Sequence, residues 1–281
     1  MLKETRYTAK GRQNSLKMLQ AIAADVPQAH ALGYRLAQRN IKAKYRQSFL
    51  GVLWAVFPPL ATSLVWIILR GQGVVSFGET GVSYSVFVLT GTFLWQVFSI
   101  SITTFLNAIN SNKSLLTKIN FPREALFYSA VYEILFNALF SFFVVVIAMF
   151  AFGVAPGVNI LYFLACLPLL ILLGLVIGLL LLPVATLFSD VIFGLPVVLQ
   201  FAMYLTPVVY PQPVYQGLGK ILDLNPVTPL LNGARSGLLG VGDLPEWSVL
   251  LLFSAVLFVL FVFGLVLMRI AMEILIERMG S

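Results

Sequence analysis

Four basic residues near the start of the chain have the spacing that phosphate binding requires. On a helical wheel they fall within about 60° of one another; they are Arg35, Arg39, Lys42 and Arg46. Arginine and lysine form charge-assisted hydrogen bonds with phosphate oxygens. Two interpretations stay open: these cations bind the phosphates of one particular ligand, or they contact membrane headgroups in general.

The element that positions these cations is expected to be an amphipathic helix that begins near Pro27 and lies in the membrane interface. Residues 1–26 show no sustained apolar period and are expected to be loosely ordered, so residues 1–47 form an N-terminal cytoplasmic segment. The remaining residues, 48–281, form a transmembrane domain with six apolar stretches of about the length that crosses a bilayer. These are Leu50–Leu69, Tyr84–Ile109, Phe127–Phe152, Ile160–Phe188, Val191–Tyr210 and Ser248–Met268.

Composition places the chain among membrane proteins. Hydrophobic residues make up 59% of it and charged residues 10%, with a mean hydropathy of +0.94. The fold class predicted is therefore an all-α polytopic membrane protein with six transmembrane helices. Most lysines and arginines precede span one, follow span two or follow span six, which places both termini in the cytoplasm. The net charge of +7 then reflects topology and anionic headgroups, not nucleic-acid binding.

Several kinds of chemistry are excluded. His30 is the only histidine and Cys166 the only cysteine, so we expect no metal site and no catalytic residues. The single Gly-Lys pair, Gly219-Lys220, is not part of a phosphate-binding loop, so the chain is not expected to hydrolyse ATP alone. Glu133 is the one acidic residue well inside a span, and its shallow depth favours a structural hydrogen bond or ion pair over a role in ion-driven transport.

Two connections have unusual sequences. The loop 111–124 is predicted to form a short amphipathic helix that docks a soluble partner, although a solvated loop is the alternative; its key residues are Lys113, Leu115, Leu116, Lys118 and Asn120. The region 211–247 is rich in proline and glycine and contains the short apolar piece Val227–Leu239, which indicates re-entrant helices on the outer side. Two features inside spans also carry expectations: Pro58-Pro59 should kink span one, and Gly174 and Gly178 permit close helix approach.

Aromatic side chains are abundant in and beside the spans. Most rings of this kind anchor helices at the membrane interface, but rings that line a conduit can also stack on sugar faces. The candidates for lining a channel are Trp54, Phe87, Trp95, Phe98, Phe136 and Tyr204.

Several motifs resemble those of one family. The run RNIKAKYRQSFLGVLW at 39–54, with Pro58 after it, resembles the start of span one in type-2 ABC export permeases. The run LLTKINFP at 115–122 is similar to the coupling helix of that family. LFSDV at 187–191 is similar to its turn between spans four and five, with Ser189 in place of the usual arginine. TPVVY at 206–210 and LNP at 224–226 resemble the segment that leads into its re-entrant helices.

The resemblance is strongest to permeases that export lipopolysaccharide O-antigens, with teichoic-acid exporters nearby. It implies a homodimer in the bacterial cytoplasmic membrane, bound to two copies of a separate nucleotide-binding subunit that holds ATP and Mg²⁺, with no cofactor on this chain. The cargo implied is an undecaprenyl-type lipid-linked polysaccharide. It would enter beside the four cations, while Asn225 and Arg235 belong to the outer re-entrant region, where Arg235 would meet a phosphate or extend to headgroups.

Two other functions are compatible with parts of the pattern. An exporter of drugs or small lipids would have the same fold and a different cargo. A membrane-embedded enzyme of lipid-linked sugars would need several acidic or histidine residues at one membrane face, and Glu124, Glu133 and Asp190 are too few and too scattered.

Overall fold

A computed structural model describes residues 15–112, 122–211 and 224–280, with side chains for 25–112, 122–211 and 224–272. All regular elements in these ranges are helical, as predicted. In chain order they are α1 (Ser15–Tyr45), the 3₁₀ helix η1 (Gly51–Ala55), α2 (Phe57–Gly71), α3 (Tyr84–Ser111), α5 (Glu124–Ala151), α6 (Ile160–Leu187), α7 (Asp190–Tyr204), α9 (Val227–Leu239) and α10 (Trp247–Gly280).

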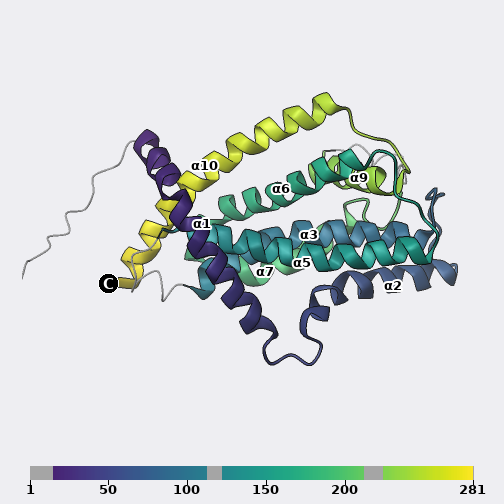
Figure 1. Cartoon of the computed structure of the whole chain (residues 1–281), viewed down its shortest axis with the longest axis horizontal. Coiled ribbons are helices and arrows are strands. Elements are labelled where there is room, and N and C mark those ends of the chain that lie inside the picture. Colours follow the sequence, from purple (N-terminus) through teal and green to yellow (C-terminus); the bar gives the residue numbers. More distant parts are fainter. Residues whose placement is uncertain (1–14, 113–121, 212–223, 281) are drawn as a thin grey trace, which may run out of the picture.

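Helix α3 is the centre of the bundle and contacts α2, α5, α6, α7 and α9 (Figure 1). Nearly every side chain from Val86 to Phe98 is buried, as expected for a helix that is apolar on most sides. Gly174 and Gly178 of α6 lie directly against it: a Cβ on Gly174 would lie 2.6 Å from the Cβ of Ser101. The predicted close approach at this glycine pair is therefore confirmed.

Among the residues that the structure describes, four helices are long and apolar enough to cross a membrane: α3, α5, α6 and the Trp247–Met272 part of α10. Helices α2 and α7 are also apolar but have 15 residues each, about 22 Å at the helical rise per residue, against a hydrocarbon core of about 30 Å. The chain is thus a multi-pass membrane protein, and a total of six spans stays a prediction.

The predicted kink in span one is wrong. Pro58 and Pro59 lie in the first turn of α2, after the separate 3₁₀ helix η1, and not in the middle of a continuous helix. The first turn of a helix tolerates proline because its N–H groups have no partner within the helix.

Helix α1 begins at Ser15, twelve residues before the predicted start, and contains Pro27 within it. It crosses the other helices at one end of the bundle, which we call the α1 end; α9 lies toward the opposite end, the α9 end (Figure 1). Its buried face consists of Ala29, Gly33 and Ala37, and a Cβ on Gly33 would lie 2.5 Å from the Cβ of Tyr128 on α5. One face of α1 is therefore part of the bundle, and its cations lie on the other.

Candidate functional site: a polar stripe on α3 between two cavities

One face of α3 is polar along most of its length. Its members recur every three or four residues, which places them in one row on a helix; we call them the α3 stripe, and they are Thr92, Gln96, Ser99, Thr103 and Asn107. All five line a cavity of about 390 Å³ between α2, α3 and α7. Polar groups at membrane depth are costly unless they are paired or face water, so this row marks a candidate path for a polar solute.

Two members of the α3 stripe have unused hydrogen-bonding capacity. Gln96 donates through Nε2 to the carbonyl oxygen of Ala55 at 2.8 Å, but its Oε1 is buried without a partner among the residues that the structure describes. The Oγ of Ser99 is likewise buried and unpaired within that part of the chain. Such groups carry a desolvation cost that a hydroxyl-bearing solute or water would relieve.

Helix α2 is fixed against the stripe by a small hydrogen-bonded cluster at the first turn of that helix. Ser63 donates to the carbonyl oxygen of Pro59, and its hydroxyl oxygen lies 2.8 Å from that of Thr92, which is within hydrogen-bond distance. The polar cavity therefore has one rigid wall, in which α2 and α3 are joined by side-chain hydrogen bonds.

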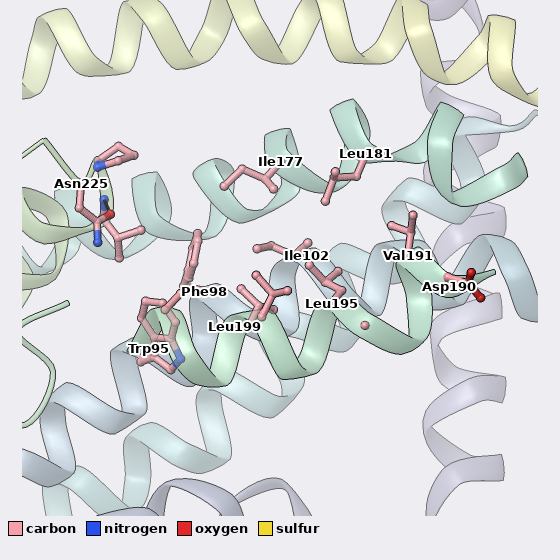
Figure 2. A pocket seen from close by; sticks show the side chains of 15 residues that line it. Trp95, Phe98, Ile102, Ile177, Leu181, Asp190, Val191, Leu195, Leu199 and Asn225 are labelled. Atoms are coloured by element: carbon pink, nitrogen blue, oxygen red, sulfur yellow. Dashed lines mark hydrogen bonds between the residues drawn. The ribbon is translucent and has the colours of Figure 1, made fainter. Parts of the chain in front are cut away.

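The other wall, α7, separates this cavity from a second one of about 680 Å³ that lies between α3, α6 and α7. Figure 2 shows Asp190 and Asn225 at opposite ends of this second cavity, with apolar side chains such as Leu195 and Ile177 between them. Trp95 and Leu199 line both cavities. Only Leu199 and Met203 of α7 are buried, so this wall is held by few packed side chains.

The aromatic residues predicted to line a channel fall into different places. Trp95 and Phe98 line the cavities beside α7, whereas Phe136 lines a separate cavity between α1 and α5. Trp54 and Tyr204 are half exposed, at 50% and 45%. Phe87 is buried beneath the guanidinium of Arg235, 4.0 Å from the ring centroid, so in this structure it packs against a cation at the α9 end.

The four predicted cations are all exposed: Arg35, Arg39 and Lys42 lie on α1, and Arg46 directly follows its last residue. Lys42 lines the cavity of about 430 Å³ that also contains Phe136 and Tyr34. Arg39 is different, because its Nη2 donates to Oδ1 of Asn112 at 3.0 Å, at the end of α3. The neighbouring Asn40 donates to Oε1 of Glu133 at 2.8 Å, which confirms the structural hydrogen bond expected for that carboxylate.

A second set of contacts at the α1 end joins three helices. Arg269 of α10 donates through Nε to Glu124 at 2.6 Å and through Nη2 to Asp25 of α1 at 2.9 Å. Asn112 and Glu124 lie near the two ends of the predicted partner-docking loop 111–124, so α1 is joined to one end through Arg39 and to the other through Arg269. The loop residues themselves, Lys113, Leu115, Leu116, Lys118 and Asn120, lie outside the described residues.

The two residues singled out in the outer region are both tied into the fold. Asn225 donates to Oγ1 of Thr206 at 2.8 Å and accepts from the backbone N–H of Val227. Arg235 is only 3% exposed and donates to the carbonyl oxygens of Pro207 and Val208. The expectation that Arg235 extends to headgroups is therefore wrong, because its guanidinium is buried between α9, α3 and the segment after α7.

The α3 stripe was not identified from sequence, although its spacing was readable. The polar residues lie in a span that is apolar on average, and only the aromatic residues beside them were predicted to line a channel. The Ala29–Gly33–Ala37 face of α1 is a second readable signal that sequence reasoning missed.

The chain is similar in sequence to known membrane transport proteins. Residues 33–239 match the family described as ABC-2 type transporter. The chain is 28% identical over 222 residues to the O-antigen export system permease protein RfbA of Myxococcus xanthus, a match that covers 76% of this chain and 83% of that protein. Two proteins of the same name from Klebsiella pneumoniae are 29% and 26% identical over 129 residues, which span just under half of their length (47%).

Proposed function

The chain belongs to the ABC-2 type transporter family, and on this premise we propose that it is the membrane permease subunit of an exporter of a lipid-linked, O-antigen-like polysaccharide. The names of its relatives support this cargo. The observation that carries the proposal is the α3 stripe, because a glycan that crosses an apolar bundle needs hydrogen-bonding groups along its path. Gln96 and Ser99 supply such groups, and Trp95 supplies an aromatic face for stacking on sugar rings.

The energy for export would come from a separate subunit. No phosphate-binding loop occurs in the sequence, so we propose that two copies of a nucleotide-binding subunit bind ATP and Mg²⁺ and dock on the loop 111–124. Closure of these subunits would push on that loop. The contacts Arg39–Asn112 and Arg269–Glu124 give the push a route into α1 and α10, which supports the coupling role.

The permease is proposed to act as a homodimer with both termini in the cytoplasm. One chain provides a wall of α2, α3 and α7, and a second copy would complete a conduit along this wall. Large apolar side chains are exposed beside the wall, including Phe193 and Phe201 of α7 and Leu64 of α2, and these suit either a second copy or lipid.

The lipid carrier would enter at α1. Arg35 and Lys42 are exposed on this helix and Arg46 directly after it, and Lys42 lies beside the apolar cavity that contains Phe136. This combination suits a ligand with a phosphate head and an isoprenoid tail, because cations bind the one and apolar surface the other. Arg39 is a weaker candidate because its guanidinium is already hydrogen-bonded to Asn112.

Adjacent threonines on α3 provide a matched test. Thr103 lines the polar cavity and Thr104 does not. Thr103→Leu should narrow the path and reduce surface display of the glycan severalfold in cells that depend on this permease, whereas Thr104→Leu should leave display near the native level. Both variants should insert equally, as judged by membrane abundance. Equal surface display of the glycan by the two variants would show that the α3 stripe is not the path of the glycan.

A further inference from the structure

A separate polar cavity lies at the α9 end of the bundle. Its volume is about 410 Å³, and six of its 11 lining residues have polar or charged side chains. These six are Glu79, Thr80, Asn232, Arg235, Ser236 and Asp243, contributed by α9 and by the loops that precede α3 and follow α9. The cavity is at the small end of the range of about 300–1,000 Å³ that is usual for small-molecule sites.

Arg235 gives this cavity a fixed donor. Its Nη2 donates to the carbonyl oxygens of Pro207 at 2.8 Å and Val208 at 2.7 Å, and its guanidinium lies 4.0 Å from the centroid of Phe87. The position depends on Gly91, since a Cβ there would collide with Nη2 of Arg235 and with the carbonyl oxygen of Val208. The guanidinium is therefore held in place before any ligand arrives.

The same side chain has an unused N–H. The Nε of Arg235 is buried and has no hydrogen-bond partner among the described residues. Burial lowers the pKa of Arg235 to about 9, so the group is still charged and a donor at neutral pH. A buried charged donor without an acceptor is costly, and Arg235 is one of the residues that line the cavity.

The charges around the cavity select the class of ligand. Two exposed carboxylates, Glu79 and Asp243, outnumber the single guanidinium, so a phosphate or another anion is disfavoured. Carboxylates accept hydrogen bonds, an arginine donates them, and amide and hydroxyl groups do both. Neighbouring hydroxyls of a neutral sugar ring need this mixture of donors and acceptors on a fixed frame.

We propose that this cavity binds one neutral sugar unit of the exported glycan at the end of the bundle opposite α1. The inference rests on the proposed export function and adds to it a binding site beyond the conduit. A sugar bound there would keep the emerging glycan from moving backward between cycles of ATP hydrolysis by the ATP-binding subunits.

Binding of single sugars to the full-length chain in lipid nanodiscs tests the site. Saturation-transfer NMR with D-mannose and D-galactose, titrated to obtain Kd, is compared with the same titration of inorganic phosphate. In Glu79→Gln/Asp243→Asn the sugar affinity should fall at least about fivefold, the effect of roughly one lost hydrogen bond. Glu246→Gln removes an exposed acid outside the cavity and should have no effect.

Three results would overturn the inference. The first is the absence of sugar binding to the native chain, and the second is equal binding by the native chain and the double variant. The third is phosphate that binds in competition with the sugar, which would make this an anion site. The export function is tested separately by the Thr103 and Thr104 variants, so an exporting chain that binds no sugar here loses only this site.

Discussion

Loss of Arg269 should be the most damaging single change at the α1 end of the bundle, because it strands a buried carboxylate. The side chain of Glu124 is 4% exposed and that of Arg269 is 14% exposed, with 2.6 Å between Nε and Oε1. Removing one partner of a buried ion pair costs about 3–5 kcal/mol, since the other charge is left without compensation. We expect Arg269→Ala to lower the free energy of unfolding by that amount.

Two further variants distinguish the cost of leaving the Glu124 carboxylate without a counter-charge from the cost of lost packing around Arg269. Asp25 is 42% exposed, so its pair with Arg269 is screened and Asp25→Asn should cost at most about 1 kcal/mol. Replacement of both buried partners by apolar residues, Arg269→Met with Glu124→Leu, should restore most of the stability because no charge is stranded.

The measurement is an SDS titration of the purified chain in mixed micelles, followed by tryptophan fluorescence. The reasoning fails if Arg269→Ala is within about 1 kcal/mol of the native chain, or if the apolar pair is as unstable as the single variant. The first result would mean that water or lipid headgroups compensate Glu124 in the membrane. The second would mean that Arg269 acts through its packing.

Two glycine positions give further predictions for the same titration. Gly91→Ala should destabilise the chain by about 1–3 kcal/mol, because its Cβ collides with the backbone at Val208. Gly194→Ala, with open space around it, should be neutral or stabilising by up to about 1 kcal/mol. Gly33→Leu should detach α1 from α5 and expose α1 to added protease, while Ala31→Leu on the exposed face should not; equal proteolysis would argue against a packed α1.

The sequence predicted the helical class and most helix positions, because long apolar runs and basic flanks are strong signals in a membrane protein. The boundaries it missed depend on backbone geometry. Pro58 and Pro59 were expected to bend a helix, but they begin one, and apolar periodicity alone does not distinguish these outcomes. Pro27 was taken as the start of α1 because proline favours the first turn of a helix, but it lies inside α1.

The candidate site was predicted less well than the fold. Hydropathy averages over a window, so the polar row from Thr92 to Asn107 was hidden by the apolar residues between its members. The role of Arg235 could not be read from the sequence, because it depends on Gly91 in α3 and on two carbonyl groups after α7. An arginine in a short outer helix is more often exposed, and only the tertiary contacts show that this one is buried.

The sequence suggested two separate roles for α1 and for the loop 111–124, one in lipid binding and the other in docking the ATP-binding subunit. The described contacts join these regions, because Arg39 bonds to Asn112 near the start of the loop and Asp25 bonds through Arg269 to Glu124 at its end. A displacement of both flanks of the loop therefore has to displace α1 or break these bonds. If the lipid carrier binds at Lys42 on the same helix, its binding and the docking of the partner are linked, and linkage of this kind acts equally in both directions.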